Sequence, residues 1–223
     1  MAVFNVVEKF ISINGEGRKA GQLAVFIRFK GCNLNCSYCD TKWANQPDAE
    51  SIQMTEQEIY DYIKACKVEN VTITGGEPLI QKDITVLLEK LSLDDSLNIE
   101  IETNGAADIS CVNNINGKRP SVTLDYKLPS SGMEQYMNMD NYSHLTSSDT
   151  VKFVSGSLDD LKKAKEVIGS YNLSETCAVY ISPVFGNIEP SEIVEFMIEN
   201  KMNKVNLQIQ LHKIIWDPQK RGV

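Results

Sequence analysis

The sequence predicts an α/β protein that folds as a partial, open TIM-type barrel of about six mainly parallel strands. Three observations support this class. Segments rich in β-branched and aromatic residues alternate with segments of helical periodicity, as in parallel sheets joined by right-handed crossovers. Several strands end directly in polar or glycine-rich motifs, which is where such sheets place their ligands. About six strands are too few to close a barrel of eight.

The strands and helices are expected in a regular order. Residues 3–13 are extended, and residues 24–29 (AVFIRF) form a strand by their β-branched and aromatic content. Further strands are expected at 71–74, 97–103, 121–124, 150–154, 176–183 and 205–213, and helices at 55–66, 83–91, 157–168 and 190–200. Thr55 with Glu58 forms a capping-box pattern at the start of the first helix.

Two segments allow more than one interpretation. Residues 129–150 are rich in Ser, Met, Asn and Tyr without a clear period, which predicts an irregular insert that could serve as a lid. In the last expected strand, residues 205–213, apolar and polar side chains alternate. Its polar face, which holds Gln208, Gln210 and His212, suits either a solvent-exposed edge strand or the lining of a binding cavity.

Composition limits the classes of function. With 42% hydrophobic and 23% charged residues, the chain is expected to be one domain over residues 1–223. A net charge of −8, without clustered Lys and Arg, argues against a nucleic-acid partner and favours a small-molecule or protein substrate. No apolar run could span a bilayer and the N-terminal residues do not form a signal peptide, so a cytoplasmic location is expected. There cysteines stay reduced, which favours metal ligation over disulfides.

Three cysteines, Cys32, Cys36 and Cys39, form a C-x3-C-x2-C array. A structural zinc site takes four ligands, and His144 and His212 are both far away in sequence. Three thiolates match a 4Fe-4S cluster with one iron left open for chemistry. Zinc or a redox pair is the alternative interpretation. The other cysteines, Cys66, Cys111 and Cys177, are scattered and are expected to be structural.

The segments around this array also suit a ligand site. The glycines at 15 and 17 allow either a simple turn or a close backbone approach to a ligand. Arg28, within an apolar strand, either reaches solvent at an edge or binds a carboxylate in a fork geometry. Gly75-Gly76-Glu77-Pro78 follows a strand directly, where free backbone groups can meet a ligand.

The cysteine array with its ending Tyr38-Cys39-Asp40 resembles the signature of the radical S-adenosylmethionine (SAM) enzymes, and Gly75-Gly76-Glu77 resembles their GGE motif. The resemblance implies a radical SAM core. In that core three cysteines hold a 4Fe-4S cluster, and SAM chelates the fourth iron through its amino and carboxylate groups. It also implies that the reduced cluster cleaves SAM to a 5′-deoxyadenosyl radical.

Within this superfamily the chain resembles the 7-carboxy-7-deazaguanine synthases of queuosine biosynthesis. The matching stretches are residues 13–17, 26–28, 31–34, 39–41 and 210–213. The resemblance implies conversion of 6-carboxy-5,6,7,8-tetrahydropterin to 7-carboxy-7-deazaguanine, with ring contraction and loss of ammonia. It further implies Mg²⁺, an external one-electron donor such as flavodoxin, and a homodimer.

The same resemblance assigns roles to individual residues. Cys32, Cys36 and Cys39 would hold the cluster, and Thr41 would hold Mg²⁺. The implied SAM contacts are Tyr38, Cys39, Asp40, Gly76, Asp125, Tyr126 and Lys127, with Glu102 and Asn104 added because their strand ends on the same rim. The implied substrate contacts are Ile13, Asn14, Gly15, Arg28 and Thr74. Three positions depart from the family pattern: Asn14 replaces Gln, Tyr38 replaces Trp and Asp125 replaces Ser.

Two other functions share part of the pattern. A radical SAM activase that acts on a protein has the same cysteine triplet, but it gives no reason for Gly15-Glu16-Gly17 or for Thr41. An iron–sulfur electron-transfer module needs a fourth strong ligand, which the sequence does not offer near the triplet.

Overall fold

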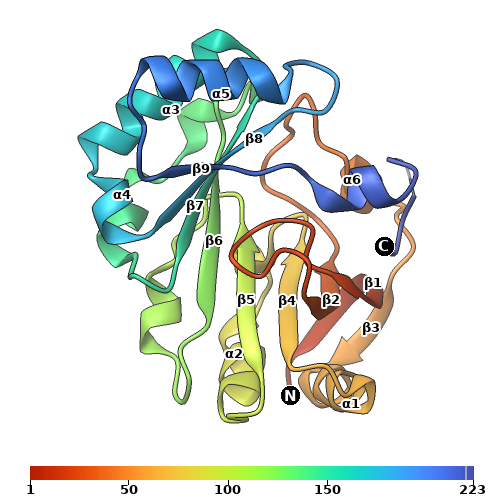
Figure 1. Cartoon of the computed structure of the whole chain (residues 1–223). Helices are drawn as coiled ribbons and strands as arrows, with labels where there is room; N and C mark the ends of the chain where they lie inside the picture. Colours follow the sequence, from red (N-terminus) through yellow and green to blue (C-terminus); the bar gives the residue numbers. More distant parts are fainter. Residues whose placement is uncertain (219) are drawn as a thin grey trace.

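The computed structural model describes residues 1–218 and 220–223, and its centre is a curved sheet in the order β3-β1-β2-β4-β5-β6-β7-β8-β9 (Figure 1). The strands are β1 Val3–Ile13, β2 Leu23–Phe29, β3 Ile52–Thr55, β4 Asn70–Gly75, β5 Asn98–Thr103, β6 Ser121–Tyr126, β7 Thr150–Ser155, β8 Ala178–Pro183 and β9 Val205–Leu207. β2 and β4 to β9 run parallel, whereas β1 is antiparallel to both β2 and β3. Within the described residues the outermost strands β3 and β9 do not pair, so the barrel is open, as predicted.

The α/β class and the mainly parallel sheet are confirmed, but the sheet has more strands than the expected six or so. β3 was not predicted. It pairs only with the first residues of β1, from Val3 to Val6, and its sequence IQMT has no clear alternation. A strand this short at a sheet edge leaves little signal in a sequence, because its neighbour rather than its composition stabilises it.

The helices cover the outer face of the sheet. They are α1 Glu56–Cys66, α2 Ile84–Ser92, α3 Leu158–Ser170, α4 Leu173–Thr176, α5 Pro190–Glu199 and α6 Leu211–Ile215. α1 and α2 lie beside β3 to β5, and α3, α4 and α5 lie beside β7 to β9, while α6 lies apart on the side of β1 and β2 (Figure 1). The predicted capping box closes α1, where Thr55 Oγ1 accepts from Glu58 N at 3.2 Å and Glu58 Oε2 accepts from Thr55 N at 2.8 Å.

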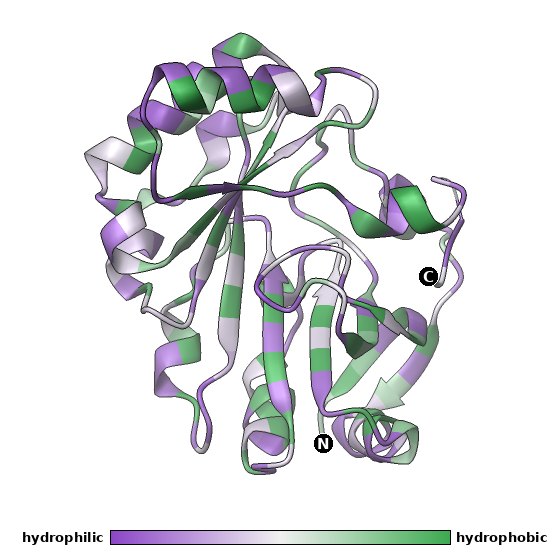
Figure 2. Cartoon of the chain, in the orientation of Figure 1, coloured by the Kyte–Doolittle hydropathy of each residue, from purple (hydrophilic) through white to green (hydrophobic). Residues whose placement is uncertain are grey.

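Alternation along the strands separates the hydrophobic core from a polar interior. On β5, Ile99 and Ile101 join the core beneath the helices, whereas Glu100 and Glu102 point into the barrel. Figure 2 shows this alternation as bands of opposite hydropathy along β4 and β5. Because the parallel strands share one direction, their C-terminal ends and their polar side chains meet on one rim.

The expected insert at 129–150 is irregular, as predicted, and is built from short 3-10 turns at Pro129–Ser131, Glu134–Tyr136 and Met139–His144. It supports the cysteine loop from one side, because Ser37 N donates to Ser131 O at 3.0 Å and Ser37 Oγ donates to Ser130 O at 2.6 Å. Asn141, fully buried, donates to the carbonyls of Gly105 and Ala107 at 3.0 and 2.8 Å.

The last strand differs from the prediction. β9 ends at Leu207, and the rest of the expected strand turns away to form α6. The reason is a change of partner. Gln208 N still donates to Ile181 O of β8 at 2.9 Å, but Leu211 N donates to Gly15 O of the N-terminal loop at 3.1 Å. Among the described residues, no helix is both long and apolar enough to cross a membrane.

Candidate active site

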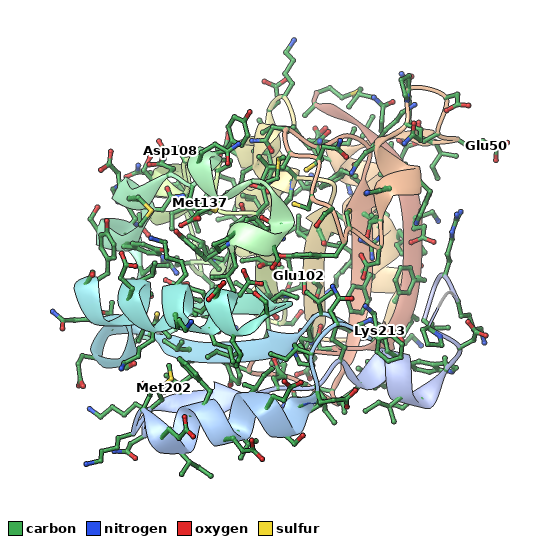
Figure 3. All side chains as sticks on the ribbon, turned by 90° about the horizontal axis from the view of Figure 1, so that it is seen from above. Glu50, Glu102, Asp108, Met137, Met202 and Lys213 are labelled. Atoms are coloured by element: carbon green, nitrogen blue, oxygen red, sulfur yellow. The ribbon has the colours of Figure 1, made fainter. Side chains whose placement is uncertain are left out.

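A cavity of ≈ 380 Å³ opens at the C-terminal ends of the parallel strands. Figure 3 looks onto this rim, with Glu102 of β5 near the centre and Lys213 of α6 toward one side. All but two of the residues to which the family resemblance assigned a role line this one cavity. They are Ile13, Gly15, Arg28, Cys32, Cys36, Tyr38, Cys39, Asp40, Thr41, Thr74, Gly76, Glu102, Asn104, Asp125 and Lys127.

The two exceptions, Asn14 and Tyr126, point elsewhere. Asn14 is 4% exposed, and its Oδ1 accepts from Thr72 Oγ1 at 2.9 Å beneath the cavity. Tyr126 is 3% exposed in the core, and its hydroxyl donates to Glu134 Oε1 at 3.1 Å. Side chains alternate along β6, so the strand directs Asp125 into the cavity and Tyr126 away from it. The Tyr126 side chain therefore lies outside the cavity, while its neighbours Asp125 and Lys127 line it.

The three cysteines of the loop after β2 have free thiols that line the cavity together. Leu34 N and Asn104 Nδ2 donate to Cys32 Sγ at 3.4 and 3.5 Å. Burial raises the pKa of the Cys36 and Cys39 thiols, and such thiols ionise when a metal binds them. In the described part of the chain, no three His, Cys, Asp or Glu side chains converge on a single metal ion. The donor set, three thiols with two N–H groups directed at Cys32 Sγ, fits a polynuclear iron–sulfur cluster, which these cysteines would hold.

Glu77 of the GGE motif fixes the end of β4 against the end of β5. Its carboxylate is fully buried and accepts from Asn104 N at 2.6 Å, Thr103 Oγ1 at 2.8 Å and Leu79 N at 3.0 Å. Asn104 in turn donates to Asn33 Oδ1 at 2.8 Å in the cysteine loop. Glu77, which had no predicted role of its own, thus ties together three segments that line the cavity.

The two glycines before Glu77 are needed for close backbone approach. A Cβ on Gly76 would lie 2.1 Å from Gly31 O and 2.3 Å from Asn45 Oδ1. Gly75 has a φ of +156°, and a Cβ there would lie 2.6 Å from Phe29 O. Gly76 N also donates to Phe29 O at 3.2 Å. The backbone at the end of β4 therefore packs directly on the start of the cysteine loop.

Four charged side chains alternate in sign across the inner wall. Lys127 Nζ lies 2.8 Å from Asp125 Oδ2, Lys152 Nζ lies 3.8 Å from the same oxygen, and Lys152 Nζ donates to Glu16 Oε2 at 3.1 Å. Burial would raise the pKa of Glu16, but the Lys152 charge and three hydrogen bonds hold that pKa below its usual range. Burial would lower the pKa of Lys152, but the nearby carboxylates hold it above its usual range. Glu16, Lys127 and Lys152 are therefore charged at neutral pH.

The N-terminal loop and the segment after β9 build one wall together. Gln208 donates to Gly17 O at 3.0 Å and accepts from Gly17 N at 2.7 Å, so its side chain binds the loop. Gln210 Nε2 donates to Glu16 Oε2 at 3.1 Å, and a Cβ on Gly15 would lie 2.3 Å from His212 Nδ1. Gln210 and His212 line the cavity, whereas Gln208 does not. Of the two interpretations of this polar face, the lining of a cavity therefore holds for Gln210 and His212.

Arg28 and Thr41, which also line the cavity, already have partners within the protein. Arg28 Nε donates to Glu8 Oε2 at 3.1 Å, and its Nη1 and Nη2 have no protein partner among residues 1–218 and 220–223. Thr41 Oγ1 donates to Asp40 Oδ1 at 2.8 Å, and Lys213 Nζ lies 3.7 Å from Asp40 Oδ2. Arg28 thus keeps a two-pronged donor face for a ligand anion, and Thr41 keeps its hydroxyl oxygen lone pairs.

Comparisons with known proteins agree with this geometry. Residues 26–118 match the Radical SAM superfamily. A curated 7-carboxy-7-deazaguanine synthase from Clostridium acetobutylicum is 60% identical over 221 residues, which cover 99% of each chain. The chain belongs to the 7-carboxy-7-deazaguanine synthase family. Another member, from Chlorobaculum tepidum, is 35% identical over 225 residues, covering 100% of this chain and 98% of that one. The crystal structure of QueE from Escherichia coli has the same fold, with a TM-score of 0.71 over 93% of this chain and 94% of that one at 22% identity.

As a radical SAM enzyme of the 7-carboxy-7-deazaguanine synthase family, the protein uses a 4Fe-4S cluster and SAM. Among the cavity-lining residues to which the sequence assigned no role are the charged side chains of Glu16, Lys152 and Lys213. Lys152 had a signal that could have been used, because a lysine inside the apolar strand TVKFVS needs a buried partner. Lys213 and Glu16 had none beyond their place in matching stretches, since their contacts join segments far apart in the chain, as Glu16 with Lys152 across 136 residues and with Gln210 across 194.

Proposed function

We propose that this protein converts 6-carboxy-5,6,7,8-tetrahydropterin to 7-carboxy-7-deazaguanine, with ring contraction and loss of ammonia. The observation that carries the proposal is one shared cavity. It joins the three cysteines with Arg28 and Thr41, which are groups suited to a carboxylate and to a hard cation. An activase for a protein substrate would give no reason for these two residues at the mouth of a cavity of ≈ 380 Å³.

Cys32, Cys36 and Cys39 would hold the cluster, which with SAM would supply a 5′-deoxyadenosyl radical for abstraction of hydrogen from the pterin carbon that bears the carboxylate. Arg28 binds that carboxylate through its free Nη groups while Glu8 holds its Nε side. Such a charge-assisted pair stabilises a bound anion by about 1.5–3 kcal/mol. Thr41 would give its hydroxyl oxygen to Mg²⁺, with the substrate carboxylate as a second ligand.

The remaining side chains would divide the cavity into two subsites. Tyr38, Asp40, Gly76 and the end of β6 lie around the cysteines and would contact SAM. Ile13 at the end of β1, Gly15 in the loop that follows it and Thr74 of β4 also line the cavity and would frame the pterin. Asn14, whose side chain points beneath the cavity, would act through the loop backbone that it holds.

The decisive test is anaerobic incubation of the reconstituted protein with SAM, Mg²⁺, a reductant and the carboxypterin, followed by mass analysis. The expected product is lighter than the substrate by the mass of ammonia, and SAM is recovered because it acts catalytically. A competent cluster that cleaves SAM but forms no such product would exclude this substrate and leave the radical SAM assignment intact.

The setting of the reaction is also part of the proposal. We infer one domain, a homodimer and a cytoplasmic location with flavodoxin as electron donor. Exposed apolar side chains on and beside α6, Ile214, Ile215 and Phe185 at 63%, 53% and 59% exposure, support a protein contact in that region. Sedimentation equilibrium tests the dimer, and product formation with reduced flavodoxin in place of a chemical reductant tests the donor.

A further inference from the structure

Lys152 of β7 lies inside the cavity between two carboxylates that belong to different walls. Its Nζ donates to Glu16 Oε2 at 3.1 Å and stands 3.8 Å from Asp125 Oδ2, within ion-pair distance. Its side chain is 11% exposed. Lys152 and Asp125 are direct neighbours in the register of β6 and β7, so the sheet itself sets this spacing.

The two carboxylates hold different parts of the proposed site. Glu16 is in the N-terminal loop next to Gly15, and Ser182 Oγ donates to its Oε1 at 2.9 Å. Asp125 is near the end of β6, where the family pattern expects a contact with SAM. Its Oδ1 is buried in the cavity wall without a hydrogen-bond partner among the described residues. A buried acceptor of this kind needs a donor, and a bound ligand can supply one.

We propose that Lys152 is a positioning residue, a counter-ion shared by Glu16 and Asp125 that sets the geometry of the pterin subsite and the SAM subsite together. The inference rests on the proposed function, from which the two subsites are taken. Lys152 needs no contact with either ligand for this role. It acts through the two carboxylates, each of which belongs to one subsite.

Charge balance on the inner wall explains why one lysine affects both subsites. Two carboxyl side chains, Glu16 and Asp125, stand against two amino side chains, Lys152 and Lys127, and Lys127 pairs with Asp125. The titratable groups that face Lys152 are Glu16, Glu100, Glu102, Asp125, Asp40 and His212. Most of them are carboxyls, so removal of Lys152 leaves an uncompensated buried negative charge. A buried charge without its partner protonates or moves toward water.

The test compares Lys152→Met with Lys152→Arg, which keeps the cation. Lys64→Met serves as the matched control. Lys64 is on α1, its Nζ lies 2.8 Å from Asp94 Oδ2, and neither residue lines the cavity. The affinity for SAM is measured from the change it causes in the electron paramagnetic resonance spectrum of the reduced cluster. The KM for the carboxypterin is measured separately. We expect K152M to weaken the affinity for SAM and to raise the KM for the carboxypterin by about tenfold each, which corresponds to ~1.4 kcal/mol. K152R should restore most of both.

A pH profile separates positioning from a general structural role. Loss of the cation raises the pKa of Glu16, so the acid limb of kcat/KM moves to higher pH in K152M and stays in place in K152R and K64M. A uniform loss of activity at all pH values, or a SAM affinity equal to that of the wild type, would overturn the inference. Should K152M unfold, E16Q/K152M removes the charge left on Glu16, and its SAM affinity is compared with that of E16Q. A tenfold difference supports the role, and equality overturns it.

The SAM measurement also keeps this inference distinct from the proposed function. It needs no pterin, because the effect of SAM on the spectrum of the reduced cluster is measured in the absence of the substrate. If the wild type binds SAM but forms no product from the carboxypterin, the proposed substrate fails. The Lys152 inference is then decided by the SAM affinity of K152M and K152R.

Discussion

Gly76→Ala tests whether close backbone packing between the GGE motif and the cysteine loop holds the site together. The added Cβ would lie 2.1 Å from Gly31 O and 2.5 Å from Gly31 C, distances that real Cβ atoms do not adopt. Gly31 O is a backbone atom that also accepts from Glu77 N at 2.9 Å, so it cannot rotate away as a side chain would. The methyl group must therefore separate the end of β4 from the loop that carries the cysteines.

The cost follows from two terms. Overpacking by one methyl group in a tight site costs about 1–3 kcal/mol. Displacement of the loop weakens the hydrogen bond from Glu77 N to Gly31 O, which contributes about 1 kcal/mol. The sum of about 2–4 kcal/mol lowers the Tm of a chain of this length by roughly 4–16 °C.

Thermal unfolding of anaerobically purified protein, with and without SAM, measures this effect. Gly169→Ala is the matched control, because Gly169 lies in α3 with no atom within 4 Å of an added Cβ. Alanine there should raise the stability by up to about 1 kcal/mol, as in other helices. G76A should have a lower Tm, a smaller stabilisation by SAM and a weaker SAM signal in the cluster spectrum. A G76A variant with the Tm and SAM affinity of the wild type would refute the reasoning.

Four further changes test other parts of the site. Arg28→Ala should raise the KM for the carboxypterin by roughly 10- to 150-fold with SAM cleavage preserved, and equal effects on both would indicate a structural arginine. Thr41→Ala should weaken the Mg²⁺ dependence of turnover while the cluster spectrum stays unchanged; an unaltered Mg²⁺ titration excludes Thr41 from this role. Glu77→Ala leaves three donors without an acceptor and should cost about 3–5 kcal/mol in chemical denaturation. Burial lowers the pKa of His212, so the unfolded chain binds more protons as the pH falls below about 6.5, and stability should fall there more in the wild type than in His212→Gln.

The regular parts of the fold were predictable because local pattern and tertiary packing agree there. The first helix has both its capping box and its apolar spacing in the sequence, and α1 begins at Glu56 directly after Thr55. The alternation in residues 97–103 likewise reproduces β5, with one face in the core and one in the barrel. In such segments a single pattern indicates both the element and the face that it buries.

The candidate site was predictable only where a motif fixed it. Motif positions led to the cysteines, Arg28 and Thr41, and these all line the cavity. The ion pairs of the site were not predictable. Glu8 meets Arg28 across the register of β1 and β2, and Lys152 meets Glu16 across 136 residues of chain. Such pairs depend on how strands lie next to one another, which a single sequence does not specify.

The error in the last strand has the same cause as the openness of the barrel. A closed barrel would give the residues after Leu207 a strand to pair with, but β9 is at the edge of the sheet. Their backbone and side chains bond instead to the loop at 14–17, through Leu211 N to Gly15 O and through both polar groups of Gln208 to Gly17. Loop contacts therefore close the rim where strand pairing does not. At this open edge of the sheet, the loop at 14–17 and the segment after β9 together form one wall of the cavity. Gln210, expected on a strand face, lines the cavity from the turn before α6, and Gln208 holds the loop.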